Sequence, residues 1–99
     1  MKMSKKRIGV YPGAFDPITF GHMDIIIRSL RIVDQLIIGV ADNINKASMF
    51  AITERQKMIE NDVKLKFSKT SQIKVMKIKG LLTDFAKKNK ANCIIRGLR

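Results

Sequence analysis

The sequence predicts an α/β fold in which helices cover both faces of a parallel sheet. Its expected strands are short, continuous apolar runs, so both of their faces are apolar, which is typical of buried parallel strands. These runs alternate with stretches of helical spacing in the order β-α-β-α-β-α-β. Because crossovers between parallel strands are right-handed, this order favours a doubly wound, Rossmann-like sheet in one domain over residues 1–99.

The first half of the chain contains two expected strands and one helix. Ile8–Tyr11 is an apolar run that stops at Pro12-Gly13, so it predicts a buried strand leading into a loop over Pro12–Gly21. A helix follows, and then Leu36–Ala41 predicts a second strand before the polar loop Asp42–Ser48. The apolar residues at helical spacing in that helix are Met23, Ile26, Ile27 and Leu30.

The second half contains two helices and two strands. Thr53-Glu54-Arg55-Gln56 fits a capping box with Thr53 at the N-cap, which predicts a helix from Thr53 to about Asn61. Ile73, Val75 and Ile78, with Met76 on the other face, predict a third strand that Gly80 breaks. A third helix and a fourth strand, Cys93–Ile95, complete the pattern. The apolar residues of the third helix, which is expected to end near Lys88-Asn89-Lys90, are Leu81, Leu82, Phe85 and Ala86.

The chain is strongly basic, with 20 Lys and Arg against 8 Asp and Glu and a formal net charge of +12. Such a charge favours anionic partners such as nucleotides, nucleic acid or acidic membranes. Lysines supply most of the excess and lie on expected solvated faces and turns. Nucleic-acid patches typically interleave arginine with aromatic side chains, whereas this chain has no Trp and one Tyr. No specific nucleic-acid partner is therefore expected.

The cysteine content and the hydropathy indicate a reduced protein without a membrane partner. Cys93 is the only cysteine, which excludes an intramolecular disulfide, and its apolar surroundings favour a buried structural thiol. The basic start is followed by only the short run Ile8–Tyr11 before Pro12, too short for a signal peptide. No run is long enough to span a membrane. We therefore expect a cytoplasmic protein.

Ligands of a doubly wound sheet bind outside the carboxyl ends of its strands, an edge that we call the rim. The first rim loop ends in Thr19-Phe20-Gly21-His22, where unpaired N–H groups and the helix dipole attract anions. Gly21 would let a phosphate approach the backbone, and His22 could donate a hydrogen bond to it. Taken alone, a Gly-His pair is also typical of a capping or surface histidine. The four expected rim segments are Pro12–His22, Asp42–Ser48, Gly80–Leu82 and Arg96–Arg99.

The longer string around this pair is more specific. It resembles the signature of the nucleotidylyltransferase superfamily in its Thr-x-Gly-His form, and it reads Tyr11-Pro12-Gly13-Ala14-Phe15-Asp16-Pro17-Ile18-Thr19-Phe20-Gly21-His22. The rest of the chain resembles one member family, bacterial phosphopantetheine adenylyltransferase. The resemblance implies transfer of AMP from ATP to 4′-phosphopantetheine, giving dephospho-coenzyme A and pyrophosphate. The matching segments are Asn45–Phe50 (a lysine loop), Gly80–Phe85 (after the third strand) and Ile95–Arg99 (an Arg-Gly-Leu-Arg motif).

The resemblance also implies roles for individual residues. His22 would stabilise the transferring phosphoryl group, which makes it the expected catalytic residue, and it would also contact ATP. Lys46 and Arg96 would hold the phosphate end of phosphopantetheine. The remaining expected contacts are Leu82 in the pantetheine site, Ala14 and Phe15 beside both ligands, and Gly97, Leu98 and Arg99 at the nucleotide, with Arg99 near the ATP phosphates. Mg²⁺ would accompany ATP, and no metal-ligating residue of the chain is expected.

These residue types suit the reaction that the resemblance implies. The attacking phosphate is already an anion, so the site needs no general base and must instead hold two repelling anions in line and offset their charge. Arg96 can grip phosphate with a bidentate fork, whereas Lys46 acts as a mobile point charge. Asp16, which precedes Pro17, has two open interpretations: an outer-sphere partner of Mg²⁺, or a residue that shapes the loop.

The chain departs from the family pattern in two places. The family usually has Thr or Ser at the position of Ala14, so one hydroxyl contact to phosphate is missing. The family chain also continues beyond Arg-Gly-Leu-Arg with a further strand, helices and a Ser-rich ATP-binding motif, so the domain is expected to be incomplete at its C-terminus.

A non-catalytic remnant that binds phosphopantetheine or nucleotide is therefore an alternative. A basic nucleic-acid-binding domain, or a nucleotidylyltransferase acting on nicotinamide mononucleotide or a sugar-alcohol phosphate, is less favoured. Because the family usually assembles as a hexamer, a homo-oligomer is expected.

Overall fold

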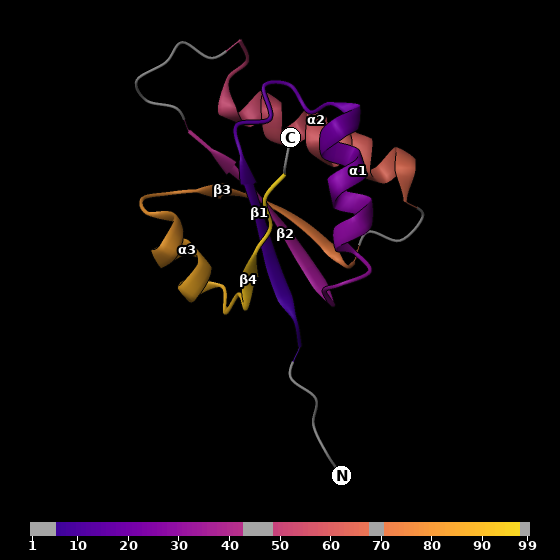
Figure 1. The fold of residues 1–99 in the computed structure, drawn as a ribbon. Helices are drawn as coiled ribbons and strands as arrows, with labels where there is room; N and C mark the ends of the chain where they lie inside the picture. The colour runs from indigo at the N-terminus through magenta and orange to yellow at the C-terminus, as the bar shows by residue number, and fades with distance from the viewer. Residues whose placement is uncertain (1–5, 43–48, 68–70, 98–99) are drawn as a thin grey trace.

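The computed structural model describes residues 6–42, 49–67 and 71–97, which form a parallel sheet with helices on both faces (Figure 1). The strand order is β3-β2-β1-β4, and every pairing between described strands is parallel. This arrangement confirms the α/β, Rossmann-like fold class. The elements are β1 (Ile8–Gly13), α1 (Phe20–Ser29), β2 (Gln35–Ala41), α2 (Ile52–Lys66), β3 (Ile73–Ile78), α3 (Leu82–Lys88) and β4 (Cys93–Ile94).

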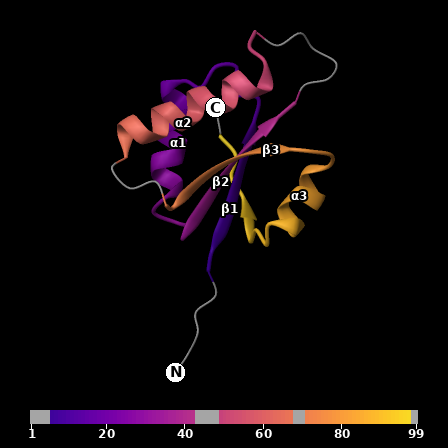
Figure 2. The same cartoon turned by 180° about the vertical axis from the view of Figure 1, so that it is seen from behind.

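The helices divide between the two faces of the sheet (Figures 1 and 2). On one face α1 and α2 build the larger core, in which Ile26, Ile38 and Ile59 are fully buried. On the other face Phe85 of α3 packs with Ile37 in a smaller core. Because Ile37 and Ile38 are neighbours in β2 and belong to different cores, the central strand is buried on both sides, as its continuous apolar sequence indicates.

β1 runs two residues beyond its expected end, through Pro12 and Gly13, which continue the pairing with β2. The carbonyl of Val10 accepts a hydrogen bond of 2.8 Å from the Ile95 N–H, so the backbone N–H and C=O groups of Val10 point toward β4. Every second residue along β1 points its backbone groups the same way. Pro12 is one of these, and β4 pairs with β1 only as far as Val10. The N–H that proline lacks would therefore meet no strand, and the ladder loses nothing.

α2 begins at Ile52, so the expected N-cap at Thr53 is wrong. Ala51 occupies the N-cap, and its N–H donates to Glu54 Oε1 at 3.2 Å. The Thr53 hydroxyl lies within 3.4 Å of the Lys77 ammonium, which donates to it. A side-chain cap contributes only about 1 kcal/mol, so other contacts can outweigh it. The earlier start allows Ile52 to pack on the larger core.

α2 also ends at Lys66, five residues beyond the expected end at Asn61. Its buried face is a stripe with a spacing of four residues, formed by Arg55, Ile59 and Val63. Val63 extends the apolar part of this stripe by one turn, which keeps the helix on the sheet. Among the described residues, no helix combines the length and the apolar character needed to cross a membrane.

Candidate active site

His22 closes a capping box at the first turn of α1. The Thr19 side chain accepts a hydrogen bond from the His22 N–H at 3.3 Å, and the Thr19 N–H donates to His22 Nδ1 at 2.9 Å. The imidazole thus takes the place that Glu or Gln fills in other capping boxes. Because Nδ1 accepts from a backbone N–H, the neutral ring carries its proton on Nε2 and donates from there. The Thr-x-Gly-His spacing therefore fixes both the orientation and the tautomer of the ring.

Aromatic side chains from β1 and its loop support this ring. The centroid of Phe15 lies 4.8 Å from that of His22 in an edge-to-face arrangement, and Tyr11 meets Phe15 edge-on at 5.2 Å. Phe15 is 2% exposed and has a φ of 48°, in the left-handed region. Phe15 thus acts as a buried support for His22, and Ala14 precedes it in the same loop.

The buried Tyr11 gives a prediction that is easy to measure. Burial raises the pKa of the Tyr11 phenol above its ordinary value, because it penalises the charged form. Tyr11 is the only tyrosine, and the chain has no Trp, so tyrosinate absorbance reports this group alone. We expect its titration midpoint to be higher in the folded chain than in concentrated urea, with circular dichroism confirming that the chain stays folded. Its stabilising contribution is full below the unfolded pKa and is lost as pH rises through the folded pKa. Equal midpoints would contradict the burial of Tyr11.

The start of α1 is suited to an anion. Its first turn contains no acidic residue, and the N–H groups of Phe20 and Gly21 belong to the helix start that intrahelical bonds leave unsatisfied. Apart from its chain neighbours and the backbone of its own helix, a Cβ added at Gly21 would meet one described atom within 4 Å, Thr19 Oγ1 at 3.6 Å. There is therefore space beside Gly21, and its role toward a phosphate stays a prediction.

The end of β4 reaches the same part of the rim. A Cβ added at Gly97 would lie 2.5 Å from Ile25 Cδ1 of α1 and 3.8 Å from the Tyr11 hydroxyl, so only glycine fits there without a shift. Arg96, directly before it, is exposed. β1 and β4 are neighbours at the point where the strand order reverses, and such switch points form the ligand crevice of doubly wound sheets.

The other expected site residues lie in different surroundings. Leu82 is the first residue of α3 and packs against the smaller core, so it lies on the opposite face of the sheet from His22. Lys46, Leu98 and Arg99 lie outside the described residues. The structure thus brings Ala14, Phe15, His22 and the Arg96-Gly97 pair to one part of the rim, and their roles toward ligands stay predictions.

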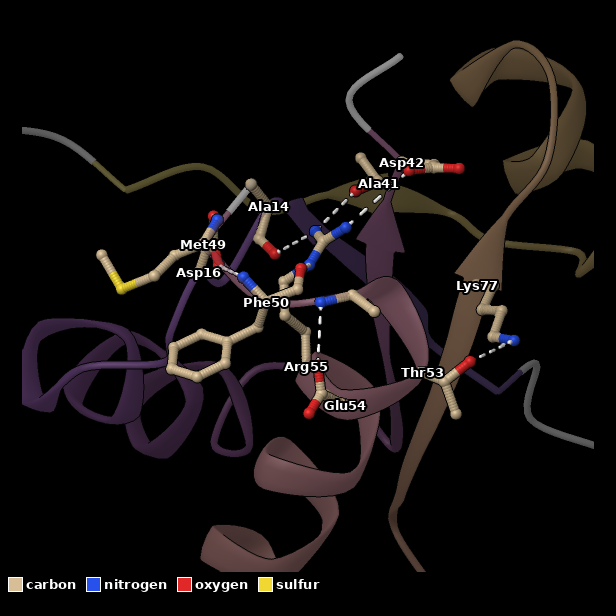
Figure 3. Close-up of polar contacts among 11 residues, drawn as sticks. Ala14, Asp16, Ala41, Asp42, Met49, Phe50, Thr53, Glu54, Arg55 and Lys77 are labelled. Carbon is tan, nitrogen blue, oxygen red and sulfur yellow. Dashed lines mark hydrogen bonds and ion pairs between the residues drawn. The ribbon is translucent and has the colours of Figure 1, made fainter. Parts of the chain in front are cut away.

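Asp16 shapes the first rim loop, which is one of the two interpretations left open by the sequence. Its two carboxylate oxygens accept hydrogen bonds from the N–H groups of Met49 at 2.6 Å and Phe50 at 2.9 Å (Figure 3). These bonds tie the loop to the residues that precede α2. Within residues 6–42, 49–67 and 71–97, no three His, Cys, Asp or Glu side chains gather as a metal site would require.

Sequence reasoning missed Arg55, which lies beneath the rim and is 1% exposed. Its guanidinium donates to three carbonyl groups in three different segments and lies beside one carboxylate (Figure 3). The available signal was the four-residue spacing of Arg55, Ile59 and Val63, which places an arginine on the buried stripe of α2. With Thr53 as the N-cap, Arg55 would lie in the first turn of the helix, where its place on the buried stripe is not evident.

Comparison with known proteins identifies the class to which this fold and rim belong. A model of the cytidylyltransferase-like family matches residues 10–99, so the chain belongs to that family. Among curated relatives, the phosphopantetheine adenylyltransferase of Wolbachia sp. subsp. Brugia malayi is 54% identical over 93 residues, which cover 94% of this chain and 54% of the relative. The phosphopantetheine adenylyltransferase of Syntrophotalea carbinolica is 49% identical over 94 residues, covering 95% of this chain and 54% of the relative. The chain thus spans about half the length of these relatives.

Solved structures agree on the fold. A bifunctional NMN adenylyltransferase/ADP ribose pyrophosphatase from Francisella tularensis, complexed with AMP and a manganese ion, matches with a TM-score of 0.72 and 22% identity over 91% of this chain and 32% of that chain. A lipopolysaccharide core biosynthesis protein from Thermoplasma volcanium matches with a TM-score of 0.69 and 21% identity over 91% of this chain and 73% of that chain. At these identities the likeness supports the fold alone.

Proposed function

We propose that the rim of this chain transfers AMP from ATP to 4′-phosphopantetheine, giving dephospho-coenzyme A and pyrophosphate. The observation that carries this proposal is the capping box that orients His22 at the start of α1. In addition, about half of the residues of the chain are identical to those of relatives named for this activity. The NMN adenylyltransferase likeness is limited to the fold, since the identity there is 22%. This difference favours phosphopantetheine over nicotinamide mononucleotide as the acceptor.

In the proposed reaction the acceptor phosphate attacks the α-phosphorus of ATP. A new P–O bond forms, the bond to the bridging oxygen breaks, and pyrophosphate leaves with the electron pair. The start of α1 and the Nε2–H of His22 offset negative charge on the α-phosphate, while Arg96 and Lys46 hold the acceptor phosphate. The acceptor phosphate is already an anion, so no proton has to be removed from it, and these groups act only as donors and cations.

Mg²⁺ enters this proposal as a companion of ATP. The described residues gather no set of carboxylates or histidines that would hold it, and both oxygens of Asp16 accept backbone N–H groups. The oxygen ligands that Mg²⁺ prefers are available on the phosphates of ATP itself. When bound there, the ion neutralises phosphate charge. Assembly of several copies, as a hexamer in the family, stays a prediction.

A second candidate function is binding of phosphopantetheine without transfer. It is favoured by Ala14, which lacks the hydroxyl that the family usually offers to a phosphate at this position. Lys46, Leu82 and Arg96 would then hold the acceptor, while ATP would not be held in line with it. This candidate predicts tighter binding of phosphopantetheine than of ATP.

Calorimetric titration of the chain with 4′-phosphopantetheine, pantetheine and nicotinamide mononucleotide tests the acceptor. We expect 4′-phosphopantetheine to bind, pantetheine to bind more weakly because it lacks the phosphate, and nicotinamide mononucleotide to bind most weakly. Binding of nicotinamide mononucleotide in preference to 4′-phosphopantetheine would overturn the proposed substrate. Equal binding of the phosphorylated and unphosphorylated acceptor would remove the role proposed for the cationic rim.

A further inference from the structure

We infer that Arg55 is a positioning residue of the rim, and that together with Asp16 it forms a clamp that holds the first rim loop against the start of α2. This inference rests on the proposed function for its catalytic consequence. The clamp itself rests on the hydrogen bonds that Arg55 and Asp16 make with described residues. Arg55 is 1% exposed and lies beneath the rim, so it acts through the segments that it holds.

The three nitrogens of the Arg55 guanidinium together reach three segments of the chain. Nε donates to the Phe50 carbonyl at 3.0 Å, and Nη1 donates to the carbonyls of Ala14 at 2.8 Å and Ala41 at 3.0 Å. Nη2 lies 3.8 Å from a carboxylate oxygen of Asp42, whose side chain is 61% exposed. One planar group thus joins the loop after β1, the end of β2 and the start of α2 (Figure 3).

Asp16 joins the same segments from the opposite direction. It belongs to the loop after β1 and accepts the N–H groups of Met49 and Phe50, whereas Arg55 belongs to α2 and donates to the carbonyl of Ala14 in that loop. Phe50 is held at both ends of its backbone, its N–H by Asp16 and its carbonyl by Arg55. This reciprocal arrangement makes the two side chains parts of one clamp.

The clamp connects the parts of the rim that the proposed reaction must align. Ala14 lies five residues before Thr19, where the capping box of His22 begins. Arg55 also donates to the Ala41 carbonyl at the end of β2 and lies beside Asp42, which follows that strand at the rim. The loop that leads to His22 and the end of β2 are therefore held by the same clamp. A loss of alignment of about 1 Å can lower a rate about 100-fold while each substrate still binds.

Arginine is the side chain that this position requires. Lysine keeps the charge but donates from one atom, so it cannot reach carbonyls on three sides of a planar group. Within the described residues no buried side-chain nitrogen or oxygen lacks a partner, and Arg55 itself donates three hydrogen bonds from Nε and Nη1. We therefore expect Arg55→Lys to disturb the rim despite its conserved charge.

Hydrogen exchange tests the clamp without requiring activity. In Arg55→Lys, the Met49 and Phe50 amides should exchange about tenfold faster, because the segment that Asp16 holds loses its second attachment. Val63→Ala is the matched control, since Val63 is 3% exposed on the same helix face and packs in the core rather than at the rim. The variants are compared well below their melting temperatures. An equal rise in the Val63→Ala variant would overturn the clamp.

Kinetics test the positioning role. If the chain transfers AMP to 4′-phosphopantetheine, Arg55→Lys should lower kcat about 100-fold with KM for either substrate changed by less than about threefold. Asp16→Asn should also lower kcat, and the double variant should be no worse than the poorer single variant, because either change opens the same clamp. Additive effects, or a kcat equal to that of Val63→Ala, would overturn the inference. If the unaltered chain produces no dephospho-coenzyme A, the proposed function fails, and the exchange rates still decide the clamp.

Discussion

Replacing His22 with alanine should lower kcat for dephospho-coenzyme A formation by about 100- to 1,000-fold, the range measured when one donor to a developing charge is removed. KM for ATP and for 4′-phosphopantetheine should change little, because the hydrogen bond from Nε2 strengthens as charge develops on the transferring group. Steady-state kinetics of pyrophosphate release measure both constants.

Two further variants separate the proposed catalytic role of His22 from its role in the capping box. In His22→Asn the side-chain oxygen can accept the Thr19 N–H as Nδ1 does at 2.9 Å, but no donor remains at the position of Nε2. In His22→Gln the amide can place a donor near Nε2. We expect His22→Asn to be stable and as slow as His22→Ala, and His22→Gln to retain part of the rate. A fast His22→Asn enzyme would show that the ring serves only the helix cap.

Replacing Arg96 or Lys46 with alanine should weaken binding of 4′-phosphopantetheine by about tenfold or more, since a hydrogen bond to a charged group contributes roughly 1.5–3 kcal/mol. Arg96 is exposed two residues beyond the end of β4, directly before Gly97, and can grip a phosphate with two parallel N–H groups. Arg96→Lys should also weaken binding, because lysine lacks this fork. Calorimetry with the purified variants measures the change.

The control for these variants is Lys88→Ala, which removes the same charge from an exposed position in the last turn of α3. It should leave the affinity nearly unchanged, and binding of pantetheine, which has no phosphate, should respond to neither Arg96→Ala nor Lys88→Ala. An equal loss in Lys88→Ala would attribute acceptor binding to the general positive charge of the chain rather than to the rim.

The sequence was sufficient to predict the fold and the location of His22. Apolar runs and helical spacing are local patterns, and the right-handed crossover rule converts their order into a sheet topology. The Thr-x-Gly-His string likewise contains its own geometry, because Thr19 and His22 are three residues apart and bond to each other. For this reason the orientation of the catalytic candidate could be anticipated from neighbouring residues alone.

The clamp could not be predicted, because its partners are distant in the sequence. Arg55 meets the Ala14 carbonyl across 41 residues, and Asp16 meets the Phe50 N–H across 34 residues. No periodic pattern encodes which carbonyl a buried guanidinium will find. The start of α2 was assigned wrongly for a related reason: Thr53 is a good local cap, but packing of Ile52 on the larger core decides the start. Tertiary contacts override local preference at both places.

Mass spectrometry of the products is the decisive test of the proposed transfer of AMP to 4′-phosphopantetheine. The chain is incubated with ATP, Mg²⁺ and equal concentrations of 4′-phosphopantetheine and nicotinamide mononucleotide, beside the His22→Ala variant. We expect dephospho-coenzyme A together with an equal amount of pyrophosphate, no adenylylated nicotinamide mononucleotide, and far less product from the variant. Binding of 4′-phosphopantetheine without any dephospho-coenzyme A, or adenylylation of nicotinamide mononucleotide instead, would contradict the proposed transfer.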